Sequence, residues 1–194
     1  VLFRSPDLAR AGAGRDRIAG NLERSVAKGR LTPEAAAAVL DRVRASDRLE
    51  DAGPADLVVE AVFEDLAVKR ALWTALDGVV RGPEAVFASN TSSISIDRLA
   101  AAVGEGRRGR FVGMHFFSPV PVMPLIELIR GAATSDATEA VIRSVAAALG
   151  KTVIVSADRP GFIVNRILMP FLAEAMRAYE EGLGTAEDID TGDR

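Results

Sequence analysis

The chain has 194 residues, of which 48% are hydrophobic and 26% are charged, an ordinary balance for a globular protein. Its net charge of −3 provides no basic surface for nucleic acid or an anionic membrane. With no cysteine and one histidine, the sequence excludes disulfides, thiolate catalysis and metal sites built from cysteine or clustered histidine. No apolar run approaches the ~20 residues of a membrane helix, and no signal peptide is evident. We therefore expect a cytoplasmic protein, or a mitochondrial-matrix protein if the source is eukaryotic.

Both ends of the chain are unusual for a natural protein. No methionine begins it, and residues 1–5 (Val-Leu-Phe-Arg-Ser) resemble a translated sequencing adaptor. These five residues are expected to be non-native, so that natural sequence begins near Pro6. The last residue, Arg194, comes directly after the start of a predicted helix. We expect the chain to be truncated at both ends.

Local patterns predict alternating helices and strands up to residue 159. Helices are predicted where apolar residues recur every three or four positions, and strands where short runs are apolar and rich in β-formers. The sequence Thr32-Pro33-Glu34 is a helix start, with a capping residue, proline in the first turn and an acid at the positive end. The predicted helices are 18–28, 35–44, 64–80, 96–103 and 135–149, and the predicted strands are 56–63, 85–88, 110–117, 125–129 and 152–155. This order predicts an α/β fold with a parallel sheet.

The pattern changes after Pro160-Gly161. Residues 162–182 carry no strand signal and are rich in Leu, Met, Ala and Phe, which predicts one long helix. We therefore expect a partial α/β domain over residues 6–159 and the beginning of an all-helical domain over residues 160–194.

Polar residues follow three of the predicted strands. They are Glu64, the Ser89–Ser93 segment and the His115–Ser118 segment. In open α/β sheets ligands bind beyond the carboxyl ends of the strands. We expect these residues to converge on one crevice.

His115 is the focal residue of this set. A lone histidine is commonly a buried residue satisfied by a backbone carbonyl, and Glu127 alone could be an exposed acid on an edge strand. However, Glu127 interrupts the apolar run 123–129 on the next strand, where an unpaired carboxylate would be costly. A glutamate bonded to one imidazole nitrogen fixes the tautomer and makes the other nitrogen more basic. The two residues therefore form a candidate base and its orienting acid.

Three motifs occur in an order and at a spacing that resemble the 3-hydroxyacyl-CoA dehydrogenases. They are Ser89-Asn90-Thr91-Ser92-Ser93, the run His115-Phe116-Phe117-Ser118-Pro119-Val120-Pro121-Val122-Met123, and Pro160-Gly161-Phe162-Ile163-Val164-Asn165-Arg166. Segments 56–61 and 187–190 match as well, so the resemblance extends over nearly everything from Pro6 to Asp190.

The resemblance implies a fold and an activity. The fold is a Rossmann-like, mostly parallel sheet that lacks its first βαβ unit, followed by the start of an all-helical domain. The activity is the reversible, NAD-dependent oxidation of an L-3-hydroxyacyl-CoA to the 3-ketoacyl-CoA, in fatty-acid β-oxidation or 3-hydroxybutyryl-CoA metabolism. The substrate is an acyl-CoA, and a homodimer through the helical domain is expected, without nucleic-acid or membrane partners.

The same resemblance assigns catalytic roles to four residues. His115 matches the base that takes the proton of the substrate's 3-hydroxyl, and Glu127 matches its orienting partner. Ser92 and Asn165 match the positions that hold the reacting oxygen or the thioester.

Further residues match binding positions of the family. Glu64, Lys69, Ser92 and Ser118 match cofactor positions, and Lys28 is a candidate for a CoA phosphate. Without the other motifs, Glu64 and Lys69 would be interpreted as a surface pair on a helix, and Lys28 as a solvated lysine. At position 118 the family more commonly has asparagine, and serine has a shorter reach.

The glycine-rich turn that binds the pyrophosphate in this family has no counterpart here. The segment Ala11-Gly12-Ala13-Gly14-Arg15 is a decoy, since no strand is predicted before it and a helical pattern follows. We expect the chain on its own to be poorly folded or inactive. The choice of NAD over NADP rests on the resemblance alone.

Two other functions remain open. One is a related dehydrogenase that acts on a free hydroxy acid or a sugar acid, which CoA binding would distinguish. The other is a non-catalytic binding protein on the same fold, although the four matched catalytic residues favour an enzyme.

Overall fold

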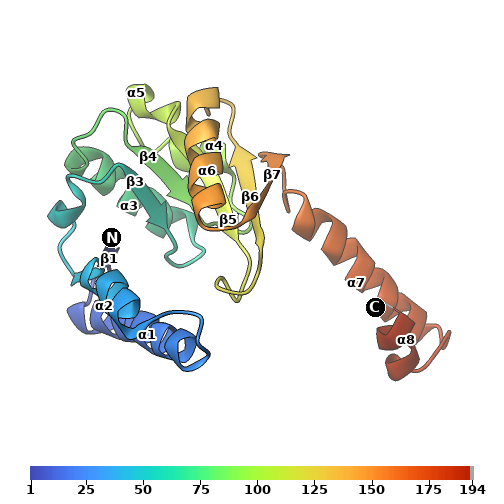
Figure 1. Cartoon of the computed structure of the whole chain (residues 1–194). Coiled ribbons are helices and arrows are strands. Elements are labelled where there is room, and N and C mark those ends of the chain that lie inside the picture. Colours follow the sequence, from blue (N-terminus) through green and yellow to red (C-terminus); the bar gives the residue numbers. More distant parts are fainter. Residues whose placement is uncertain (193–194) are drawn as a thin grey trace. The chain divides into compact units, whose positions relative to one another are not determined.

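The computed structural model describes residues 1–192, and the chain divides into two compact units. The first unit comprises Val1–Val58 and Ala71–Ala85, and the second comprises Val59–Arg70 and Val86–Arg194. Figure 1 shows the elements in chain order.

The first unit contains a helical hairpin, a small parallel sheet and most of α3 (Leu66–Val79). Strand β1 (Leu2–Arg4) pairs in parallel with β2 (Arg44–Ser46), and α1 (Leu8–Ala27) and α2 (Pro33–Asp41) lie between them in the chain. A short 3-10 helix, η1 (Glu50–Ala52), follows. The Thr32 hydroxyl accepts a hydrogen bond from the backbone of Ala35, so the predicted helix start is confirmed.

The expectation that no strand precedes residue 11 is wrong, because β1 does. A strand of three residues is too short to show an alternating pattern. Gly14 lies inside α1 and faces β1: a Cβ added there would lie 2.2 Å from Cε1 of Phe3. Gly14 thus allows α1 to pack closely on β1, whereas nothing lies within 4 Å of a Cβ added at Gly12. The expectation that residues 1–5 are non-native is a statement about their origin, and it stays a prediction.

A five-stranded sheet of order β3-β4-β5-β6-β7 confirms the predicted α/β class. The strands are β3 (Leu57–Glu60), β4 (Val86–Ser89), β5 (Phe111–Phe116), β6 (Leu125–Arg130) and β7 (Thr152–Ala157). The helices within this part of the chain are α3 (Leu66–Val79), α4 (Ile96–Ala100), α5 (Glu105–Arg108) and α6 (Asp136–Ala148).

The sheet is mostly, but not wholly, parallel. Strands β4 and β5 are parallel, as are β6 and β7, whereas β5 and β6 are antiparallel. An antiparallel pair needs no crossover helix. The eight residues between β5 and β6 contain none, which is the sequence signal that distinguishes this pair from the others.

The core of the second unit lies around β5 and β6. Phe111, Val112, Ile126, Leu128 and Ile129 are all 0% exposed. Helix α6 packs on β5, β6 and β7. Full burial of each such side chain stabilises the fold by about 1.5–3 kcal/mol. The two central strands therefore form a rigid platform for the residues they carry.

Two helices follow the sheet, α7 (Val164–Glu180) and α8 (Ala186–Gly192). The turn before α7 has positive φ at both Gly161 (76°) and Phe162 (49°). The left-handed region is open to glycine but strained for phenylalanine, which indicates that packing holds this turn in place. No helix within residues 1–192 is both long enough and apolar enough to cross a membrane.

Candidate active site

His115 and Glu127 are directly opposite each other on β5 and β6. The antiparallel register places both side chains on one face of the sheet. Nδ1 of His115 lies 3.1 Å from Oε2 of Glu127, and the two side chains are 7% and 0% exposed. The alternative interpretation of Glu127 as an exposed edge acid is wrong, because β6 lies between β5 and β7.

The imidazole ring of His115 contacts two aromatic rings. The ring centroid of Phe117 lies 4.7 Å away and that of Phe162 lies 5.9 Å away. Because the Glu127 carboxylate can only accept a hydrogen bond, Nδ1 of His115 must donate it. A neutral imidazole therefore carries its hydrogen on Nδ1 and its lone pair on Nε2. Within residues 1–192, Nε2 has no hydrogen-bond partner. This nitrogen is therefore free to accept a proton.

Glu127 also binds the start of the helical segment. Its Oε1 accepts hydrogen bonds from the backbone N–H groups of Ile163 at 2.6 Å and Val164 at 3.2 Å. In the same turn, Nδ2 of Asn165 donates to the backbone oxygen of Ser92 at 3.4 Å. The structure thus brings the four predicted catalytic residues into one connected cluster.

The turn that follows β4 is held by Glu64. Its Oε1 accepts from the backbone N–H groups of Ser92 at 2.9 Å and Ser93 at 3.1 Å, and the Thr91 hydroxyl donates to the same oxygen. Partial burial raises the pKa of Glu64, but the hydrogen bonds from this turn and the charge of Lys69 outweigh it and lower this pKa to about 2. Glu64 is therefore ionised at any ordinary pH.

Lys69 is buried, with 1% of its side chain exposed. Its Nζ lies 2.5 Å from Oε1 of Glu60 and 3.2 Å from Oε2 of Glu64. The alternative of a surface pair is therefore wrong, since the ammonium lies inside the protein between two carboxylates. Sequence reasoning missed Glu60, although it shows the same signal that identified Glu127, an acid within an apolar strand.

Asn90 is a second residue that sequence reasoning passed over. Its side-chain oxygen accepts a hydrogen bond from the backbone of Phe116 at 2.8 Å, and its own N–H donates to the backbone oxygen of Glu60 at 2.8 Å. The ends of β3, β4 and β5 are thereby joined. Ser118 is exposed just beyond β5, and Lys28 is the exposed C-cap of α1 in the first unit.

The exposed groups at these strand ends fit the polar end of a dinucleotide. Ser92 and Ser118 are exposed, and the Glu64 side chain is 39% exposed. Hydroxyls and a carboxylate are suitable partners for a carboxamide and a ribose. No group of three or more His, Cys, Asp or Glu within the described residues could hold a metal ion.

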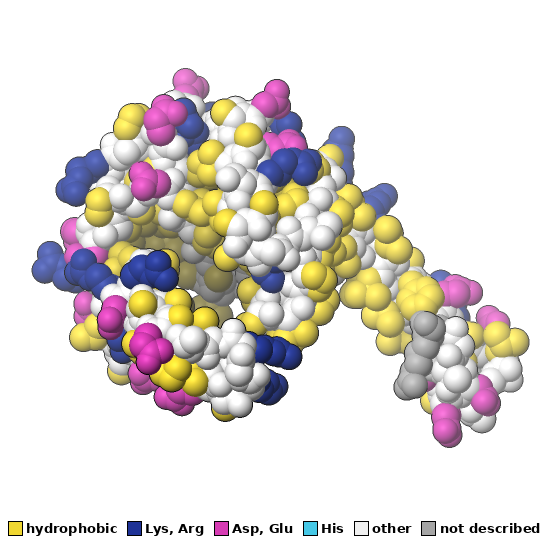
Figure 2. Space-filling model, viewed as in Figure 1, with side chains coloured by type: hydrophobic (Ala, Val, Ile, Leu, Met, Phe, Trp, Pro, Cys, Tyr) yellow, Lys and Arg dark blue, Asp and Glu magenta, His cyan; other side chains and the backbone are white. Residues whose placement is uncertain are grey.

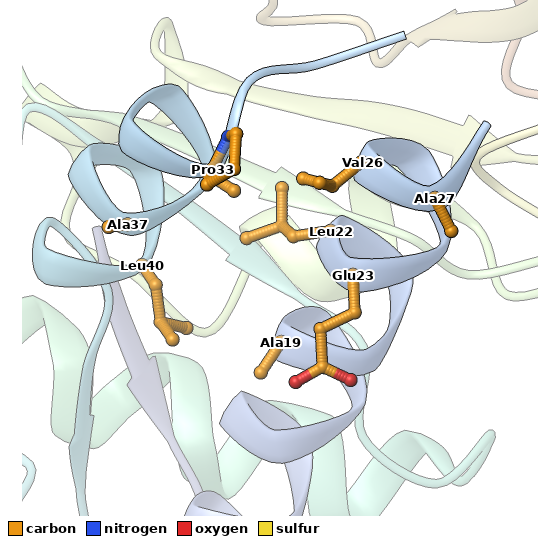
Figure 3. A pocket seen from close by; sticks show the side chains of 9 residues that line it. Ala19, Leu22, Glu23, Val26, Ala27, Pro33, Ala37 and Leu40 are labelled. Carbon is orange, nitrogen blue, oxygen red and sulfur yellow. The ribbon is translucent and has the colours of Figure 1, made fainter. Parts of the chain in front are cut away.

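A cavity in the first unit carries no catalytic side chain. It has a volume of about 410 Å³ between α1 and α2. Figure 3 shows Leu22, Val26 and Leu40 among the apolar side chains that line it. The chemistry of the chain is therefore found at the strand ends of the second unit.

Comparison with known proteins gives two family matches. Residues 1–159 match the model of the 3-hydroxyacyl-CoA dehydrogenase NAD-binding domain, and residues 161–193 match the model of the C-terminal domain of the same family.

Individual relatives agree with these matches. A 3-hydroxybutyryl-CoA dehydrogenase of Bradyrhizobium diazoefficiens is 49% identical over 190 residues, which cover 98% of this chain and 64% of the relative. One of Mycobacterium tuberculosis is 45% identical, over 92% of this chain and 62% of the relative. The crystal structure of an (S)-3-hydroxybutyryl-CoA dehydrogenase from Ralstonia eutropha is 42% identical with a TM-score of 0.92, covering 97% of this chain and 65% of that one. The chain thus spans less than two thirds of the length of each.

Proposed function

Because the chain belongs to the 3-hydroxyacyl-CoA dehydrogenase family, we propose that its full-length gene product catalyses the reversible oxidation of an L-3-hydroxyacyl-CoA to the 3-ketoacyl-CoA with NAD. The observation that carries this proposal is the His115–Glu127 pair. It supplies a buried, oriented imidazole with a free Nε2 at the end of a strand. A secondary alcohol must lose its hydroxyl proton to become a ketone, and an imidazole is suited to accept it.

In this proposal the protein's own groups orient the substrate and move one proton. Nε2 of His115 accepts the proton of the 3-hydroxyl, and Oε2 of Glu127 stabilises the imidazolium that results. Bound NAD, which Glu64, Ser92 and Ser118 would face, would supply the acceptor for the hydride that leaves C3. In the reverse direction His115 returns the proton to the ketone oxygen. The rings of Phe117 and Phe162 contact the imidazole and help to hold its orientation.

Ser92 and Asn165 are proposed to hold the reacting oxygen or the thioester. Their link, from Nδ2 of Asn165 to the backbone oxygen of Ser92, supports a shared function. Glu64, Ser92 and Ser118 are proposed to face the cofactor, and Lys69 to support that side of the site. Lys28 remains a proposed CoA contact, supported by its exposed position at the end of α1.

We propose 3-hydroxybutyryl-CoA as the preferred substrate class, because relatives from Bradyrhizobium diazoefficiens and Ralstonia eutropha carry that name. The rival substrate is a free hydroxy acid or sugar acid on the same scaffold. NADH oxidation by the full-length gene product, followed by absorbance, separates them. Turnover of acetoacetyl-CoA that is much faster than turnover of free acetoacetate is the expected result. Equal rates with both, or turnover of a sugar acid alone, would reject a CoA thioester as the substrate.

Assembly is a separate proposal. We propose a homodimer through the helical segment that begins at Pro160, in a cytoplasmic or mitochondrial-matrix protein. Figure 2 shows hydrophobic side chains gathered along α7, and Ile167, Met176 and Leu183 are 66%, 66% and 81% exposed. Apolar surface of this kind is normally covered by further protein. Light scattering of the full-length gene product should give twice the chain mass, and a monomer would reject the proposal.

A further inference from the structure

The Glu60 carboxylate is fully buried at the end of β3, and protein donors surround it. Its Oε1 accepts from Nζ of Lys69 at 2.5 Å and from the backbone of Val62 at 2.8 Å. Its Oε2 accepts from the Ser89 hydroxyl at 2.6 Å. A buried carboxylate is tolerated only with such partners. With 0% of its side chain exposed, Glu60 cannot touch a substrate or a cofactor itself.

Lys69 is equally enclosed. An ammonium has three N–H donors, and Nζ of Lys69 has three acceptors within the protein: Glu60 at 2.5 Å, Glu64 at 3.2 Å and the backbone oxygen of Val62 at 3.4 Å. No donor remains for a ligand unless one of these contacts breaks. The charge of Lys69 therefore acts on the two carboxylates beside it.

Glu64 connects the buried ion pair of Glu60 and Lys69 to the active site. While its Oε2 faces Lys69, its Oε1 binds the backbone N–H groups of Ser92 and Ser93. An unbroken path of charged hydrogen bonds thus runs from buried Glu60, through Lys69 and Glu64, to the backbone of Ser92. Charge-assisted bonds of this kind are the strongest that side chains make.

We infer that Glu60 is a positioning residue, which fixes Lys69 and Glu64 and thereby holds the turn that carries Ser92. The inference rests on the proposed function, in which Ser92 contacts the substrate. Loss of the Glu60 charge leaves the ammonium of Lys69 with one carboxylate, so that Lys69 and Glu64 shift together. The Ser92 backbone then loses its fixed position, although neither Ser92 nor Glu64 has been changed.

The kinetic test is a double-mutant cycle on the full-length gene product. Glu60→Gln should lower kcat about tenfold, with KM for acetoacetyl-CoA changed much less, and in a Ser92→Ala background it should lower kcat less than about twofold. Glu139→Gln is the matched control, because it removes the charge of another carboxylate, on α6, that pairs with Arg130 and Arg143 away from the strand ends. It should leave kcat within about twofold of wild type. An equal loss from Glu60→Gln in both backgrounds overturns the inference.

A second measurement does not depend on activity. Hydrogen exchange at the amides of Ser92 and Ser93 should be about tenfold faster in Glu60→Gln and unchanged in Glu139→Gln. Unchanged exchange in both variants overturns the inference, even in an enzyme that turns over acetoacetyl-CoA. If wild type does not turn over this substrate but exchange responds as expected, the proposed function fails and the positioning path stands.

If Glu60→Gln does not fold, a double variant in which both buried charges are replaced by neutral side chains provides the same test. The double variant Glu60→Gln/Lys69→Met leaves no buried charge without its partner. The double variant also removes the contacts that fix Glu64. It should therefore show the same faster amide exchange at Ser92, and its loss of kcat should again be smaller in a Ser92→Ala background. Exchange at the wild-type rate in this variant overturns the inference.

Discussion

The backbone N–H of Ile163 donates a 2.6 Å hydrogen bond to Oε1 of Glu127, whose other oxygen lies 3.1 Å from Nδ1 of His115. The buried carboxylate of Glu127 therefore contacts both β5 and the start of α7. It orients the imidazole on β5, and it fixes the first turn of α7, which carries Asn165. Any change at Glu127 is expected to affect the base and the helical segment together.

Glu127→Gln is predicted to lower kcat of the full-length gene product by about 10² or more. The carboxamide has one acceptor, which the backbone N–H groups of Ile163 and Val164 claim, so its NH₂ faces His115. Nδ1 must then accept a hydrogen bond, the ring hydrogen moves to Nε2, and the base is blocked.

Steady-state kinetics with acetoacetyl-CoA measure this effect, with Glu139→Gln as the control. Glu139 is a carboxylate on α6 that pairs with Arg130 and Arg143, away from the strand ends. The control should keep kcat within about twofold of wild type. Wild-type kcat in Glu127→Gln would show that the pair does not orient the base.

Glu64 gives a prediction about pH. Its pKa is lowered from 4.5 to about 2, so the ionised group stabilises the fold fully above pH 4.5, and this stabilisation is lost as pH falls toward 2. The difference in unfolding free energy between wild type and Glu64→Gln should therefore be constant above pH 5 and shrink steadily below about pH 4.5. Denaturant titrations at several pH values measure it. A difference that is the same at pH 3 as at pH 7 contradicts the assigned contacts.

Gly113 gives a prediction about packing beneath His115. A Cβ at this position would lie 2.8 Å from Cβ of Ile129 and 2.9 Å from Cδ1 of Ile96. Gly113→Ala is therefore predicted to lower the free energy of unfolding by about 1–3 kcal/mol. Gly106→Ala is the control, since nothing lies within 4 Å of the added Cβ and the residue is in α5. It should unfold at or slightly above the wild-type midpoint, and equal losses in both variants would contradict the packing.

Much of the fold follows from local patterns. From β3 to α7, every strand and helix except the four-residue α5 was predicted within a few residues, because their cores are apolar runs of clear period. Strand β1 was missed because three residues cannot show a period. The antiparallel β5–β6 pair differs from the predicted parallel sheet because strand direction depends on the connection, not on the strand's own residues.

The candidate site, too, was predicted only in part from the sequence. His115 and Glu127 were predicted as a pair because an acid in an apolar strand requires a partner, and the register confirms that they are opposite each other. Glu60 carries the same signal, yet its partner Lys69 is nine residues away and comes from a helix. Such a contact depends on how the helix packs on the strand ends, which no local pattern encodes.

The central claim is that His115 is the base of a dehydrogenase. The most direct measurement compares wild type with His115→Gln in the full-length gene product, by following NADH oxidation with acetoacetyl-CoA. The two proteins are compared at equal concentration, after their Tm values have been shown to be the same. Rapid turnover by wild type and a loss of about 10² or more in the variant is the predicted result. Turnover by His115→Gln within a few-fold of wild type would contradict the account.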